Sequence, residues 1–125
     1  MAGILAASWA LVVTGLVLAG GRTTAQAAGQ DPITILDRVF SVAQADRGES
    51  RFKQSCTGCH AAVQFAEPAF SARWEGRTVG DVFRYLSETM PENDPGGLAP
   101  AQYADLVAFF LGQSGYPVGD DELPA

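Results

Sequence analysis

The clearest periodic pattern in the chain lies near its C-terminus, where apolar residues recur with the spacing of one helix face. Five apolar side chains fall at i, i+3, i+4, i+7 and i+8: Tyr103, Leu106, Val107, Phe110 and Leu111. Pro100 stands where a first-turn proline is tolerated, and Gly115 stands where a glycine commonly ends a helix. The pattern predicts a helix between these two residues, with its apolar stripe packed into the core.

A second helix is indicated by residues 79–89, where Val82, Phe83 and Leu86 follow a helical spacing. Residues 90–97 come directly after it and are rich in Pro, Gly, Asn and Asp, the residues that favour turns. We therefore expect this helix to run into a loop, which then leads to the C-terminal helix.

Residues 46–56 predict a further helix, on which Gly48 and Phe52 share one face four positions apart. A glycine inside a helix normally costs about 1 kcal/mol relative to alanine. Its presence therefore indicates that another backbone approaches closely at this point. We expect Val107 and Phe110 of the C-terminal helix to meet Gly48 and Phe52.

The N-terminus carries an apolar run over residues 4–18, followed by a small and polar stretch. Ala25 and Ala27 supply the small-x-small pattern of a signal peptidase site. The segment therefore predicts a secretory signal peptide over residues 1–27, cleaved after Ala27, with Ala28 as the neighbouring alternative.

An uncleaved membrane anchor is the alternative interpretation of the apolar run. A spanning helix needs about 20 apolar residues, and Arg22 on the far side of this shorter run opposes export. Signal peptides usually begin with a positive charge, but no Lys or Arg precedes the run. Two explanations of this missing charge are that the free α-amino group suffices, or that the true start lies further upstream. We expect a periplasmic protein whose mature chain is not stably inserted in a membrane.

Composition narrows the classes of partner. Cleavage after Ala27 leaves 98 residues, enough for one small domain. It removes Arg22 from 8 basic and 14 acidic side chains, so the mature chain has 7 basic residues and a formal charge of −7. This charge argues against nucleic acid or an anionic membrane surface as a partner.

The chemistry is concentrated in residues 56–60, which read Cys-Thr-Gly-Cys-His and contain both cysteines and the only histidine of the chain. This spacing is the attachment signature for c-type haem. Two thiols, Cys56 and Cys59, add across the haem vinyl groups, and the adjacent imidazole of His60 ligates the iron. We therefore expect one covalently attached haem c.

Three other interpretations of the same motif are weaker. A thioredoxin-like redox pair needs a βαβ pattern, and nothing upstream of Cys56 reads as a buried strand. Structural zinc normally takes four Cys or His ligands, and the chain has three such residues. A disulfide between Cys56 and Cys59 would leave the adjacent His60 unexplained.

From Asp46 to the region of Pro117, the chain resembles the class I cytochrome c family. The resemblance rests on the haem motif, the paired terminal helices with Gly48 and Phe52, a proline loop and a Met-Pro loop. It implies an all-α small cytochrome c fold, with helices packed around one haem. We expect a signal peptide over 1–27, an N-terminal extension over 28–45 that packs over the core, and a cytochrome c domain over 46–125.

Met90 is the candidate for the second axial ligand of the iron. Met1 leaves with the signal peptide and no second histidine exists, so Met90 is the sole thioether of the mature chain. Class I cytochromes place their methionine ligand in such a context, ahead of a proline after a helix, as in Met90-Pro91. The alternative is a methionine that fills a gap in the core.

Supporting residues of the haem pocket follow from the same resemblance. Pro68 resembles the family proline whose carbonyl accepts from the other ring nitrogen of the histidine and orients it. Glu67 stands before it, where relatives often have glycine. Arg73, Trp74 and Arg77 form a basic and aromatic cluster that either binds the haem propionates or lies exposed in solvent.

The resemblance implies an electron-transfer protein, not an enzyme. It would carry one electron at a time through an exposed haem edge near residues 61–63, from a periplasmic dehydrogenase towards an oxidase or another cytochrome. The tail after Gly115 resembles cytochromes that accompany quinoprotein dehydrogenases, so a dedicated dehydrogenase subunit competes with a diffusing carrier. The alternative is a protein of another functional class, a haem sensor. It would bind carbon monoxide or nitric oxide after Met90 is displaced.

Overall fold

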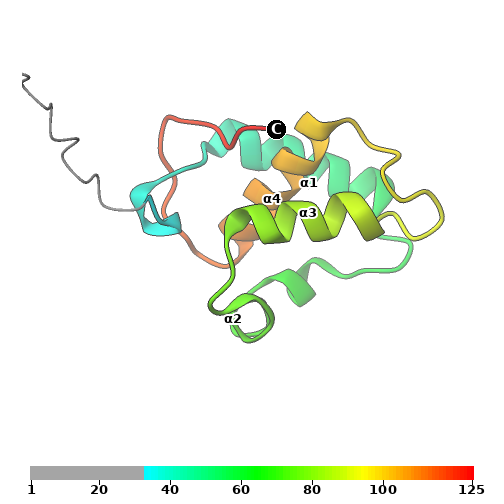
Figure 1. The fold of residues 1–125 in the computed structure, drawn as a ribbon, viewed down its shortest axis with the longest axis horizontal. Helices are drawn as coiled ribbons and strands as arrows, with labels where there is room; N and C mark the ends of the chain where they lie inside the picture. Colours follow the sequence, from blue (N-terminus) through cyan, green and yellow to red (C-terminus); the bar gives the residue numbers. More distant parts are fainter. Residues whose placement is uncertain (1–32) are drawn as a thin grey trace, which may run out of the picture. The chain divides into compact units, whose positions relative to one another are not determined.

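A computed structural model describes residues 33–125, and the expected signal peptide over 1–27 lies outside this range. The described residues form helices and one isolated bridge, between Ser41 and Gly119 (Figure 1). The elements in order are η1 Ile35–Asp37, α1 Val42–Ser55, η2 Ala62–Phe65, α2 Ala69–Trp74, α3 Val79–Thr89 and α4 Pro100–Gln113. The expected all-α fold is confirmed.

Helix α4 is the central element of the core. Its buried residues include the whole predicted stripe and further neighbours: Tyr103, Ala104, Leu106, Val107, Ala108, Phe109, Phe110 and Leu111. The helix begins at Pro100, and Gly115 follows it with a positive φ of 78°, a backbone conformation that glycine adopts at little cost. Both predicted ends are therefore confirmed. Helices α1 and α3 pack against it (Figure 1).

The close approach expected at Gly48 is present. A Cβ atom on Gly48 would overlap the carbonyl group of Asp105 and would lie 2.8 Å from Cβ of Phe109. The ring of Phe52 packs against Phe110 as expected, with centroids 6.0 Å apart. Prediction and structure differ in the neighbours of Gly48, which are Asp105 and Phe109 in place of Val107. Residues four apart share a helix face, whereas a residue midway between them faces elsewhere.

Helix α1 begins at Val42, four residues earlier than the expected start at Asp46. The hydroxyl of Ser41 accepts a hydrogen bond from the backbone N–H of Gln44 at 3.0 Å, which makes Ser41 the N-cap. Directly before the cap, Phe40 is fully buried. The final part of the expected extension therefore belongs to α1 and to the core.

Helix α3 has the bounds predicted for it, and Thr78 caps its start. The Thr78 hydroxyl accepts from the N–H of Asp81 at 3.1 Å, and the Asp81 carboxylate accepts from the N–H of Thr78 at 3.0 Å. This reciprocal arrangement is a capping box, and it holds the pKa of Asp81 below its ordinary value because the carboxylate accepts these bonds. Val82 and Leu86 bury the inner face.

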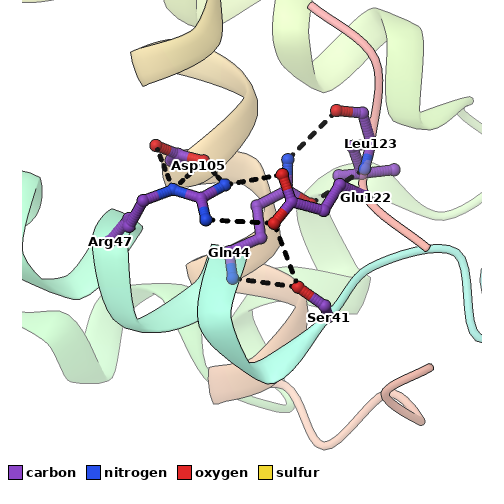
Figure 2. Close-up of polar contacts among 6 residues, drawn as sticks. All are labelled: Ser41, Gln44, Arg47, Asp105, Glu122 and Leu123. Atoms are coloured by element: carbon purple, nitrogen blue, oxygen red, sulfur yellow. Dashed lines mark hydrogen bonds and ion pairs between the residues drawn. The ribbon is translucent and has the colours of Figure 1, made fainter. Parts of the chain in front are cut away.

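The C-terminal tail lies along the start of α1 and is held there by polar contacts (Figure 2). The side chain of Gln44 donates to the carbonyl of Leu123 at 3.0 Å and accepts from its N–H at 2.8 Å. The guanidinium of Arg47 bridges Asp105 of α4, at 2.9 Å, and Glu122 of the tail, at 2.7 Å. These contacts join the tail to α1 and α4, a connection that the sequence pattern did not predict.

Two short elements lie between α1 and α3 that the hydrophobic pattern did not predict. They are the 3-10 turn η2 and the six-residue helix α2. Elements this short cannot show a helical period, and in α2 only Phe70 is buried. Within residues 33–125, no helix is both long enough and apolar enough to span a bilayer.

Candidate functional site

The site is a cavity of about 660 Å³, open to solvent on one side and bordered by the end of α1, η2, α2, α3, the loop after α3, and α4. This volume falls in the range of roughly 300–1,000 Å³ that is typical of cofactor pockets. Its lining includes the residues Cys56, Cys59, His60, Gln64, Phe65, Phe70, Arg73, Trp74, Tyr85, Leu86, Met90, Leu98, Tyr103, Leu106 and Phe110. Apolar and aromatic side chains therefore form most of the wall, and a few polar groups interrupt it.

The Cys-x-x-Cys-His segment forms a tight turn directly after α1. The N–H of Cys56 still donates to the carbonyl of Phe52, at 2.9 Å, and so ends the helix. The carbonyl of Cys56 then accepts from the N–H groups of Cys59, at 3.1 Å, and His60, at 2.9 Å. This turn places the two thiols and the imidazole at one wall of the cavity.

The two thiols differ in exposure and are not joined by a disulfide. Cys59 is exposed, whereas Cys56 is partly buried. Burial raises the pKa of the Cys56 thiol, and the nearby charge of Arg51 opposes part of that effect. The described residues also lack the βαβ pattern that a thioredoxin-like redox pair requires.

The imidazole of His60 is oriented by neighbours from η2. Its Nδ1 lies 3.4 Å from Oε1 of Gln64, which also accepts from the N–H of Ala61 at 3.0 Å. The ring packs edge-on against Phe65, with centroids 5.7 Å apart. A ring nitrogen held by a hydrogen bond fixes the tautomer and direction of a ligating histidine.

Pro68 differs from expectation, since its carbonyl accepts from the N–H of Ala72 at 3.1 Å and starts α2. Among the described residues, those that line the cavity do not include Pro68. The structure places Gln64 where the sequence suggested Pro68. Gln64 had no signal of its own in the sequence, because an exposed glutamine four residues after a histidine is common.

Met90 lies on the other side of the cavity, at the end of α3. Its N–H donates to the carbonyl of Leu86 at 2.9 Å and completes the last turn of the helix. Its carbonyl accepts from the buried hydroxyl of Tyr103 at 2.7 Å. The sequence predicted Tyr103 as a core residue only, since a period shows that a side chain is buried but not what its hydroxyl meets.

The three residues of the basic and aromatic cluster separate in the structure. Arg73 and Trp74 line the cavity, and the guanidinium of Arg73 lies 4.8 Å from the ring centroid of Tyr85 and 5.5 Å from that of Trp74. Such cation–π contacts hold an arginine in place. Arg77 lies instead at a second, smaller cavity of about 380 Å³, which Trp74 also borders.

The sequence model of a protein family described as "Cytochrome C oxidase, cbb3-type, subunit III" matches residues 43–110. The chain belongs to this family of c-type cytochrome domains. Searches of curated proteins and of solved structures gave no significant match.

A c-type cytochrome domain binds haem c covalently and carries electrons. The residues present fit this group. Two thiols and an imidazole lie at one wall of the cavity, a thioether lies at another, and aromatic and aliphatic side chains line the space between them. Thioether bonds formed from two cysteine thiols, with axial His and Met ligands, are how haem c is held. The domain is therefore an electron-transfer domain with redox partners.

Proposed function

We propose that the chain is an exported, periplasmic one-electron carrier with a single haem c, attached through Cys56 and Cys59 and ligated by His60 and Met90. One observation carries the proposal: these four side chains, 34 positions apart at the extremes, line the same cavity. These residues would hold a haem that would supply reversible one-electron chemistry between a donor and an acceptor.

The protein side chains have distinct parts in this function. Gln64 holds the ring of His60 through Nδ1 and leaves Nε2 free to face the metal. A Met90 thioether favours the ferrous state, which raises the reduction potential. Arg73, held against the rings of Trp74 and Tyr85 at the cavity wall, would supply a positive charge for a haem propionate.

Electron exchange would take place at the side of the cavity where Cys59 is exposed. Val63 in η2 lies nearby in sequence and is 73% exposed. Apolar exposed side chains beside a cofactor edge favour brief contact with a partner, because contact removes apolar surface from water. This exposure supports the expectation that electrons pass through a haem edge near residues 61–63.

A periplasmic dehydrogenase is the proposed donor, and an oxidase or another cytochrome is the proposed acceptor. Support comes from the family resemblance and from the acidic balance of the mature chain, which suits a basic docking surface on a partner. A diffusing carrier would show reduction kinetics that slow steeply with ionic strength. A dedicated subunit would instead co-purify with a larger enzyme.

The test is the visible spectrum of the protein expressed with the c-type maturation system, oxidised and reduced, with and without carbon monoxide. We expect a covalent c-type spectrum, a methionine-to-iron charge-transfer band in the oxidised form, and no response to carbon monoxide. A prompt shift with carbon monoxide would contradict the carrier function and favour the small-ligand sensor. Absence of covalent haem would overturn both.

A further inference from the structure

The loop between α3 and α4 is tied at both ends to one buried hydroxyl group. Tyr103 of α4 is 2% exposed. Its hydroxyl donates to the carbonyl of Met90 at 2.7 Å and lies 3.4 Å from the N–H of Leu98, from which it accepts. The ring is held edge-on to Phe83 of α3, with centroids 6.3 Å apart. One side chain therefore joins both ends of the loop, at Met90 and Leu98, to the core.

Ala99, the last residue of the loop, donates from its N–H to the side chain of Gln102 in α4 at 2.9 Å. Residues 91–97 are joined by bonds within the loop. The N–H of Asp94 donates to Pro91 at 2.9 Å, and the N–H of Gly97 donates to Asp94 at 3.0 Å. Both bonds form turns within the loop and do not connect it to a helix. Residues 92–97 are exposed. The position of the loop against the cavity therefore depends on its two ends, where Tyr103 acts.

From this arrangement we infer that Tyr103 is a positioning residue for Met90: it holds the loop closed and thereby controls how readily an external ligand replaces the Met90 thioether. The inference rests on the proposed ligation by Met90. A neutral thioether is a weak ligand. It therefore stays bound to the iron only if the backbone that carries it is held in place. Holding a loop in its bound conformation before binding lowers the entropy cost of binding.

The size of the effect follows from one hydrogen bond. Loss of a hydrogen bond of ordinary net strength changes the equilibrium constant between the closed and the open loop about fivefold. Tyr103→Phe removes the hydroxyl and keeps the ring that packs against Phe83. We therefore expect the population of the open loop to rise about fivefold, with no loss of the closed state as the main form.

The experiment measures imidazole binding to the oxidised holoprotein, in which imidazole replaces a displaced methionine. Tyr103→Phe should increase the observed binding rate about fivefold while the methionine-to-iron charge-transfer band is retained. Tyr116→Phe is the matched control, since it removes a hydroxyl from a ring that packs against Phe70 and borders the smaller cavity. An unchanged rate in Tyr103→Phe would overturn the positioning role.

Amide hydrogen exchange provides a readout that does not depend on ligand binding. In the wild-type holoprotein, the Leu98 N–H should exchange more slowly than the exposed amides of the same loop, and Tyr103→Phe should remove that difference. Exchange of Leu98 at the rate of an open peptide in the wild type would overturn the inference even if the variant failed to fold.

Met90→Ala separates failure of the inference from failure of the proposed ligation. If this variant binds imidazole rapidly and Tyr103→Phe does not, Met90 is the ligand and the positioning role of Tyr103 is wrong. If Met90→Ala has the spectrum and the binding rate of the wild type, the proposed ligation is itself wrong, and the role of Tyr103 falls with it.

Discussion

Gly48 of α1 lies against the carbonyl of Asp105 in α4, with no room for a Cβ atom between the two backbones. The Phe109 Cβ atom closes the same space from the next turn. This contact sets the distance between α1 and α4, the two helices that pack most extensively against each other. The haem motif follows directly after α1, and Tyr103 belongs to α4, so the helix crossing also positions both walls of the cavity.

Replacing Gly48 by alanine should destabilise the protein, because the added methyl group meets backbone that cannot move aside. Overpacking of this kind costs about 1–3 kcal/mol. The free energy of unfolding of the holoprotein in denaturant measures the effect.

Gly80→Ala is the matched control for Gly48→Ala. The added Cβ would meet only the Thr78 hydroxyl at 3.6 Å, which is ordinary contact. Since alanine favours a helix over glycine by about 1 kcal/mol, this variant should equal or exceed the wild type in stability. Equal stability of Gly48→Ala and the wild type would show that the close approach is wrong.

Met90→Ala should lower the reduction potential, because loss of the thioether removes the preference for the ferrous state. We expect a change on the order of 100 mV, within the roughly 0.8 V over which axial ligands set haem potentials. Equilibrium redox titration measures it. Met90→His is a second variant for comparison. Its imidazole should fill the axial position that Met90→Ala leaves open to carbon monoxide, and the reduction potential should stay low. A wild-type potential in Met90→Ala would contradict axial ligation.

Substituting serine for both Cys56 and Cys59 should abolish covalent attachment, since each thiol forms one thioether bond. Acid–acetone extraction should release haem from this double variant and leave it on the wild-type polypeptide. Ser55→Ala, beside the motif, is the control and should retain the haem. Retention of haem by the double variant would exclude these thiols as the attachment points.

The carboxylate of Glu122 should make stability depend on pH in the acid range. Hydrogen bonds from Arg47 hold the pKa of Glu122 below its ordinary value of 4.5. A carboxyl group with a lowered pKa in the folded state stabilises the protein fully above its ordinary value. This contribution is lost as the pH falls through the lowered value.

Denaturant midpoints measured from pH 7 down to pH 3 check this effect. Glu122→Gln should lower the midpoint at neutral pH and flatten its decline below pH 4.5. Asp121→Asn removes the same charge from the same segment and serves as the control. Parallel curves for the wild type and Glu122→Gln would show that the contact to Arg47 contributes nothing measurable.

The mature protein should begin at Ala28 if the signal peptide over 1–27 is cleaved as the sequence predicts. Intact-mass measurement of the exported protein identifies the N-terminus directly, once the mass of the attached haem is subtracted. Replacing Ala25 and Ala27 by bulky residues should block cleavage, because signal peptidase needs small side chains there. An N-terminus at Met1 in the wild type would favour the membrane-anchor alternative.

Local patterns were sufficient for much of this protein. The period of apolar residues predicted α4 and α3, and the bounds of α3 are those of residues 79–89. The order of five residues in the haem motif identified the chemistry, because a turn of fixed length sets the spacing of its donors. The helical period and the spacing of the motif both involve residues close together in the chain, so they can be recognised from the sequence without knowledge of the tertiary structure.

Tertiary structure decided what lies far apart in the chain. Gly48 was recognised as a close approach from α1 alone, but its partners Asp105 and Phe109 depend on the rotation of α4 about its axis. Two contacts of the site depend on side-chain directions that a hydrophobic period does not encode. Gln64, not Pro68, lies beside His60, and the hydroxyl of Tyr103 donates to the carbonyl of Met90. Spacing along the chain determined which groups were available, whereas packing of the helices decided which of them meet, because burial brings distant residues together through shape and hydrogen bonding.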